Sequence, residues 1–255
     1  MRHTSKKAGT GLSLRLFRLS RSAVLWHLSV ALTAINAYGQ TSMLSTPQEL
    51  LATDPRGFAE WLETARPKPV SAQNKARILG TLPPEGEITT LNEAARRKLA
   101  ALSQLFRATE RDSVYEIKVV ESPFARTGLY ERTVVLISET ALELMEAADL
   151  QALMAHEIAH EYIWTQRERA SRLRDYYRLK ELELLSDAIA IVILHGLGLD
   201  PSRLMATVEK LTRYNRKVLG VTIDESGYPT LSERREFARR VTAWVARASP
   251  PRSSR

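Results

Sequence analysis

The chain has 255 residues, 44% of them hydrophobic, which is enough to bury a core, and its formal net charge at pH 7 is +8. Six basic and no acidic residues lie in the first 39 positions, so the rest of the chain has 31 basic against 29 acidic residues. No basic surface with interleaved aromatic residues follows, which disfavours nucleic-acid binding. The chain has no cysteine, which excludes disulfides and a lipid-anchored N-terminal cysteine.

The N-terminus has the pattern of an export signal. A basic stretch precedes the apolar residues 23–37, and Ala37 and Gly39 put small side chains at the two positions recognised for cleavage. We therefore expect residues 1–39 to be a signal peptide and the mature chain to start near Gln40, in the periplasm of a bacterium or outside the cell. The apolar segment is short for a spanning helix, but left uncleaved it would be a membrane anchor.

Residues 40–89 are predicted to form an N-terminal helix and a connector. The helix covers residues 46–64, with Asp54-Pro55 in the cap and first-turn positions that these residue types favour. The connector, through residue 89, contains four prolines. A capping-box pattern, Thr90 to Glu93, then opens a helix that ends near Thr109.

Residues 90–248 are predicted to form one mostly helical α+β domain, followed by a disordered tail at 249–255. The β-branched stretches 115–121 and 133–138 predict two strands of a small antiparallel sheet. Further helices are expected at 139–146, around the apolar stretch 150–162, at 166–180, around 182–195, from Asp200-Pro201, and after the capping box Thr230 to Glu233.

Residues 156–160 read HEIAH, within an apolar stretch of helical spacing that lacks Pro and Gly. Two histidines four residues apart on a helix project from one face, close enough to bind one metal ion, and Glu157 stands beside them. This pattern predicts a zinc site with His156 and His160 as ligands. A chance pair of histidines on a metal-free helix is the alternative interpretation.

A catalytic zinc site usually has three protein ligands, and we expect the third to be Glu183. In the sequence ELLSD, Glu183 and Asp187 lie one helical turn apart, so that Glu183 can bind the metal while Asp187 accepts the ring N–H of a ligand histidine. Glu181 competes as a ligand, but only Glu183 has an acid one turn later. His195 ends an apolar helix, where a histidine favours the negative end of the helix dipole, so we interpret it as structural.

The HExxH motif followed by an ExxxD helix resembles the gluzincin class of zinc metallopeptidases. The closer resemblance, over roughly residues 90–245, is to the family that contains the HtpX heat-shock protease and the CAAX prenyl endopeptidase. It implies a zincin-like core that binds one zinc ion through His156, His160 and Glu183. It also implies Glu157 as the catalytic base, Asp187 behind a ligand histidine, and a protein or peptide substrate.

Two further parts of the site follow from this resemblance. Family members often carry a His-Pro pair before a final helix, where this chain has Tyr228-Pro229. A tyrosine phenol can donate the same hydrogen bond, so Tyr228 is a candidate for stabilising the oxyanion, with a packed loop tyrosine as the alternative. Residues 123–128 lie where the family places the segment that pairs with the substrate backbone, and an ordinary connection between strands is the alternative there.

The sequence thus predicts a zinc-dependent metalloendopeptidase that hydrolyses peptide bonds through an activated water, as relatives do in envelope protein quality control. A noncatalytic zinc-binding or chaperone-like module of the same fold is the alternative. The sequence indicates no oligomeric state.

Overall fold

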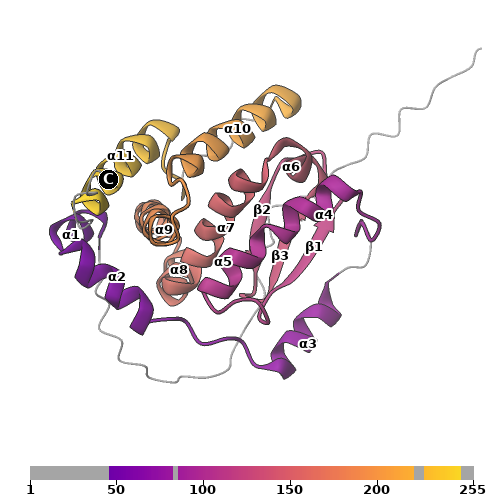
Figure 1. Ribbon diagram of the computed structural model, residues 1–255, viewed down its shortest axis with the longest axis horizontal. Coiled ribbons are helices and arrows are strands. Elements are labelled where there is room, and N and C mark those ends of the chain that lie inside the picture. The colour runs from indigo at the N-terminus through magenta and orange to yellow at the C-terminus, as the bar shows by residue number, and fades with distance from the viewer. Residues whose placement is uncertain (1–45, 83–85, 221–226, 248–255) are drawn as a thin grey trace, which may run out of the picture. The chain divides into compact units, whose positions relative to one another are not determined.

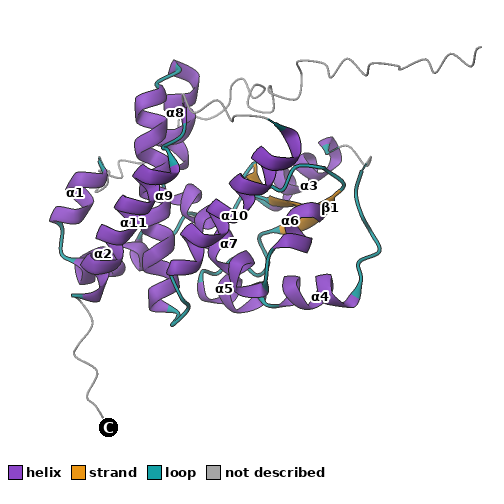
Figure 2. Cartoon of the chain, turned by 90° about the horizontal axis from the view of Figure 1, so that it is seen from above, coloured by secondary structure: helices purple, strands orange, loops and turns teal. Residues whose placement is uncertain are grey.

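The computed structural model describes residues 46–82, 86–220 and 227–247 (Figure 1). The mostly helical α+β class predicted from the sequence is confirmed (Figure 2). The predicted signal peptide at 1–39 and the tail at 249–255 lie outside the described residues. The helices are α1 (Pro47–Ala52), α2 (Pro55–Thr64), α3 (Ala72–Thr81), α4 (Glu93–Ala100), α5 (Leu102–Ala108), α6 (Glu139–Leu144), α7 (Ala147–Tyr162), α8 (Trp164–Leu173), α9 (Tyr176–Gly196), α10 (Ser202–Leu219) and α11 (Leu231–Ala246). The strands are β1 (Glu116–Val120), β2 (Thr127–Tyr130) and β3 (Val134–Ser138).

The three strands form one mixed sheet in the order β1-β3-β2. β1 pairs with β3 in parallel, with Glu116 opposite Val134, and β2 pairs with the other side of β3 in antiparallel, with Thr127 opposite Ile137. β3 takes the central position because its apolar side chains are buried on both faces of the sheet, as is usual for a central strand. β2 is therefore an edge strand, and it lies against α7.

The small sheet, predicted to be antiparallel, is mixed: β2 pairs with β3 in antiparallel, but β1 pairs with β3 in parallel. The stretches at 115–121 and 133–138 do form strands, but they run in the same direction. The reason is the segment between them, which contains β2 and crosses back before β3 begins.

Two long, largely buried helices, α7 and α9, form the centre of the helical part. α7 lies between the sheet and α9 (Figure 1). Every residue of α7 from Asp149 to Glu161 is buried, because the helix has neighbours on every side: α5, α9, α10 and β2. Polar side chains in such a helix must be paired.

The N-terminal part contains more helix than the prolines suggested. The expected helix at 46–64 is interrupted after Ala52, and α2 begins where Asp54-Pro55 predicted a helix start, with Asp54 accepting a hydrogen bond from the Gly57 amide at 2.9 Å. The expected irregular connector contains α3, which Ser71 caps.

Other helix boundaries differ from the prediction because other residues cap or end the helices. Asn92, and not Thr90, caps α4, and a break at Ala101 separates α4 from α5. The expected helix at 166–180 is divided between α8 and α9, because Arg174 adopts a left-handed conformation with φ of 53° that ends α8. The capping box at Thr230 is confirmed. Among the described residues, no helix combines the length and apolar character needed to cross a membrane.

Candidate metal centre

Helices α7 and α9 bring the three predicted zinc ligands together. His156 and His160 lie one turn apart on α7, and Glu183 lies on α9 opposite them. Each offers a ligand atom within 4.8 Å of the other two, and all three residues are buried. His156 Nε2 is 3.5 Å from one oxygen of Glu183, and His160 Nε2 is 3.9 Å from the other.

These separations fit a single small cation. Bonds of about 2.0–2.1 Å at tetrahedral angles put two ligand atoms of a zinc ion roughly 3.4 Å apart. The observed distances of 3.5 and 3.9 Å are close to this value. Of the competing residues, Glu181 forms an ion pair with Arg178 at 2.8 Å, and His195 lies exposed in the last turn of α9. The two imidazoles and one carboxylate are thus a suitable donor set for zinc.

The orientation of His160 is fixed by Ser186, a residue inside the ELLSD sequence. Ser186 Oγ lies 3.0 Å from the Leu182 carbonyl, to which it donates its only proton, and 2.9 Å from His160 Nδ1. The hydroxyl must therefore accept the Nδ1 proton, which leaves the lone pair of His160 on Nε2, facing Glu183. Burial and the nearby Arg167 hold the pKa of His160 well below its usual value, so the ring is neutral. A neutral imidazole is the form that binds a metal ion.

Nδ1 of His156 faces Asp187, the residue that the sequence predicted to lie behind a ligand histidine. His156 Nδ1 lies 2.9 Å from Asp187 Oδ1. Arg234 on α11 holds the Asp187 carboxylate with two bonds, of 2.8 and 2.6 Å. Burial raises the pKa of Asp187, but Arg234 and His156 outweigh it, and the pKa is lowered. Asp187 is thus a fixed anion behind the ligand.

The same anions change the protonation of His156. Burial lowers the pKa of His156, but the carboxylates of Asp187 and Glu183 outweigh it and raise the pKa to about 9. Burial also raises the pKa of Glu183, which the surrounding histidines and Arg167 reverse, so that it lies well below its usual value. Without a metal ion, His156 therefore carries a proton that a bound cation would replace.

Glu157 lies beside the ligands and contacts the edge strand instead of the ligand atoms. It accepts a hydrogen bond from the Leu129 amide at 3.1 Å and one from the Thr127 hydroxyl at 3.3 Å. Burial, which His156 partly offsets and Glu183 reinforces, raises the pKa of Glu157. A buried carboxyl with a raised pKa next to a metal position is suited to accept and return a proton.

Arg167 contacts Glu183, whereas Tyr228 is linked to the site by the electrostatic effects on its pKa. Tyr228 is 42% exposed, and partial burial together with the charges of Glu183 and Glu157 raises the pKa of its phenol, which keeps it protonated. Arg167 on α8 lies 3.2 Å from Glu183. Arg167 was not predicted from the sequence, although it lies two helical turns beyond His160, because α7 ends between the two residues.

The contact between Ser186 and His160 leads to a testable expectation. Replacing Ser186 by alanine removes the acceptor that holds the Nδ1 proton, and such partners change metal affinity by about 10- to 100-fold. We expect zinc to bind more weakly by this factor, measured by competition with a chelator of known affinity. Ser171→Ala, on the exposed surface of α8, is the matched control and should not change the affinity. Equal affinities for both variants would contradict the orienting role.

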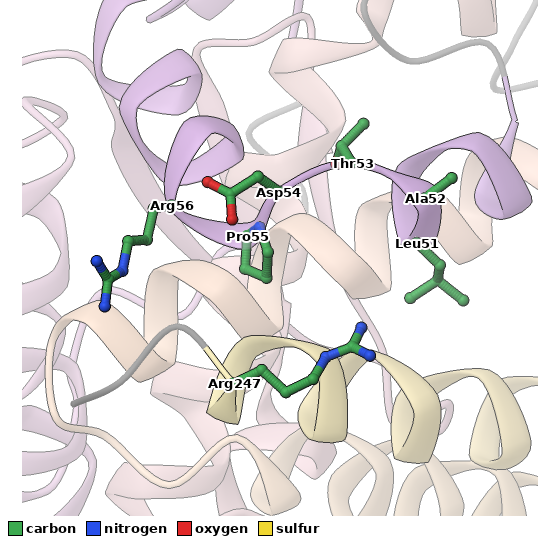
Figure 3. A pocket seen from close by; sticks show the side chains of 7 residues that line it. All are labelled: Leu51, Ala52, Thr53, Asp54, Pro55, Arg56 and Arg247. Carbon is green, nitrogen blue, oxygen red and sulfur yellow. The ribbon is translucent and has the colours of Figure 1, made fainter. Parts of the chain in front are cut away.

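A surface depression of about 700 Å³ lies elsewhere, where the end of α11 meets α1 and the start of α2 (Figure 3). It is lined by Leu51, Ala52, Thr53, Asp54, Pro55, Arg56 and Arg247. None of the candidate site residues contributes to it. The function therefore has to be inferred from the metal centre between α7 and α9.

Comparison with known proteins gives one family match, over a segment that contains the candidate ligands. Residues 90–191 match peptidase family M48. The matched segment includes the sheet, the HEIAH helix and the ELLSD part of α9, but it ends before Asn215, Tyr228 and Arg234. No curated protein matches the chain significantly. The match supports a metallopeptidase, whereas the narrower resemblance to the HtpX and CAAX enzymes stays a prediction.

Proposed function

We propose that this protein is a zinc-dependent metalloendopeptidase that cleaves bonds within protein or peptide chains. The observation that carries the proposal is the convergence of three buried ligands, His156, His160 and Glu183, beside Glu157, an acid that the metal does not need. The similarity to peptidase family M48, which covers α7 and the part of α9 that carries Glu183, supports it.

The residues of the chain divide the chemistry among them. A zinc ion held by the three ligands would lower the pKa of a water molecule towards neutrality and polarise a peptide carbonyl. Glu157 is proposed to take the proton of the attacking water and to deliver it to the leaving amine. Asp187 and Ser186 hold the ligand imidazoles in the orientation that points Nε2 towards Glu183.

Tyr228 is proposed to stabilise the oxyanion that forms when water adds to the carbonyl. A tyrosine phenol is protonated at neutral pH and can donate a hydrogen bond, and the raised pKa of Tyr228 extends this to higher pH. The negative charges of Glu183 and Glu157 add to burial in raising the pKa of this phenol. Arg167, 3.2 Å from Glu183, adds positive charge next to the proposed ligands.

The edge strand β2 is proposed to hold the substrate in extended form. The carbonyls of Arg126 and Tyr130 accept hydrogen bonds from β3 and the turn before it, so by alternation the backbone groups of Thr127 and Leu129 face away from the sheet. This edge lies directly beside Glu157. A peptide paired with it would place a carbonyl near the base, with affinity that comes from backbone bonds.

A noncatalytic zinc-binding or chaperone-like module of the same fold would need the ligands but not the base. Glu157 is buried and held by two hydrogen bonds next to the ligands, an arrangement that a binding module does not require. A catalytic function therefore accounts for the position of Glu157, which a binding module leaves unexplained.

We propose an extracytoplasmic location in a bacterial envelope, with a role in protein quality control there. The N-terminal sequence pattern, a basic stretch followed by an apolar segment and small residues at the cleavage positions, supports it. Fractionation of cells that express the chain with and without residues 1–39 tests the location, and recovery of both forms in the cytoplasm would reject it.

Metal removal tests the proposed function directly. We expect the purified protein to hold one equivalent of zinc and to cleave casein, and a chelator to abolish the cleavage until zinc is restored. His160→Ala should lose both the metal and the activity, because it removes one of the three residues proposed to bind the zinc ion. His195→Ala, at the exposed end of α9, is the matched control and should keep both. Absence of zinc from the wild-type protein would reject the centre, and zinc without cleavage would favour the binding module.

A further inference from the structure

The side chain of Asn215 on α10 pairs with the backbone of Ala125, just before β2. Asn215 Oδ1 accepts from the Ala125 amide at 2.8 Å, and Asn215 Nδ2 donates to the Ala125 carbonyl at 2.9 Å. A carboxamide side chain has the same donor and acceptor as a peptide group. Asn215 thus binds both backbone groups of one residue, as a neighbouring strand would.

Ala125 belongs to the same edge as the groups beside the proposed base, an edge that pairs with no further strand within the described part of the chain. The Ser138 amide donates to the Arg126 carbonyl at 3.0 Å, so Arg126 faces β3 and Ala125 faces away from it, as Thr127 and Leu129 do. The outward-facing positions along this edge are therefore Ala125, Thr127 and Leu129. Glu157 contacts the last two, and Asn215 occupies the first.

We propose that Asn215 ends the substrate-binding edge at Ala125 and so limits how much of a peptide on the C-terminal side of the cleaved bond can pair with the sheet. The proposal rests on the peptidase function proposed above. An antiparallel peptide, which pairs slightly better than a parallel one, runs from Leu129 towards Ala125. Ala125 lies two residues before Thr127, about 7 Å along an extended strand.

The substrate class follows from this limit. Backbone pairing stops within about two to four residues after the reacting carbonyl, since the peptide group that would continue it meets the Asn215 amide. Residues further along the substrate gain no hydrogen bonds from this edge. The enzyme therefore selects substrates by the segment before the cleaved bond and by a short segment after it.

A peptide series with substitutions at Asn215 tests the limit. The peptides share one N-terminal half and carry one to six residues after the cleaved bond. For the wild type, we expect KM to fall with the first added residues and then to stay constant. Asn215→Ala frees both Ala125 groups, so KM should keep falling with length, by about 2- to 10-fold for each added backbone bond. Asn215→Leu removes the two hydrogen bonds to Ala125 but keeps a side chain of similar volume there. KM should therefore stop falling at the same peptide length as in the wild type.

The two variants separate this role from a purely structural one. If Asn215 only stabilised the loop before β2, alanine and leucine would change KM in the same way at all lengths. Arg213→Ala, exposed on the same helix, is the matched control and should show the wild-type length dependence. An identical length dependence for the wild type and Asn215→Ala would overturn the proposal.

The same peptides, labelled and titrated against Glu157→Gln with and without Asn215→Ala, give a readout that does not require cleavage. Fluorescence anisotropy should show the same change in length dependence for the dissociation constant. If Glu157→Gln binds the peptides with this length limit but the wild type cleaves none of them, the proposed peptidase function is rejected, while the role of Asn215 in peptide binding is retained. If neither cleavage nor binding depends on length in any variant, the role of Asn215 fails.

Discussion

Replacing Glu157 by glutamine is expected to lower kcat by about 10²- to 10⁴-fold, the usual contribution of a general acid–base, while zinc stays bound. Glutamine has nearly the same shape and retains an oxygen that can accept from the Leu129 amide, so the fold should be unaffected. It cannot take a proton from water. Casein cleavage and zinc content, measured on the same sample, test both parts of this expectation.

Glu168→Gln is the control for this experiment, because it removes an exposed carboxylate from α8 without touching the ligands. It should leave kcat within about twofold, as is usual for a surface change away from the site. Equal residual activity in the wild type and in Glu157→Gln would reject Glu157 as the base. Loss of zinc in Glu157→Gln would instead indicate that Glu157 helps to bind the metal.

Replacing Glu161 by alanine is expected to lower the free energy of unfolding by about 3–5 kcal/mol, the cost of breaking a buried ion pair from one side. The Glu161 side chain is fully buried next to the ligand His160. It accepts from Arg111 Nε at 2.8 Å, from Arg132 Nε at 3.1 Å and from the Tyr115 hydroxyl. The alanine variant leaves the buried Arg111 without its carboxylate. Urea denaturation followed by circular dichroism measures the change.

The matched control is Glu93→Ala, at the start of α4. Glu93 pairs with Arg96 at 2.9 Å, but both side chains are mostly exposed, so solvent replaces the interaction at little cost. Its midpoint in urea should stay close to that of the wild type. If the Glu161 and Glu93 variants unfold at the same urea concentration, Glu161 does not anchor the end of the metal-binding helix.

Most of what the sequence could predict about the site depends on patterns between residues close together in the chain. The spacing of two histidines in HEIAH and of two acids in ELLSD depends only on helical periodicity, and the structure brings these residues together as expected. The capping box at Thr230 is another local pattern, with its partner three residues away.

Contacts between distant segments were not predictable in this way. Arg234 reaches Asp187 across 47 residues, and the Leu129 amide reaches Glu157 across 28, and no spacing rule covers such distances. The parallel pairing of β1 with β3 depends on where β2 inserts, which is also a long-range property. The left-handed residue Arg174 was missed because it is not a glycine, the usual residue type for that conformation.

The hydrogen bond from the Leu129 amide to Glu157 gives the resting protein an internal competitor for its own substrate. A backbone amide has one proton, so a peptide carbonyl that pairs with Leu129 must take that proton away from the carboxylate. Occupying the edge therefore exchanges one acceptor for another, and this first backbone bond adds little net affinity. The same exchange frees an oxygen of Glu157 when a peptide is in place, so the proposed base accepts a proton more readily with a peptide bound than without one.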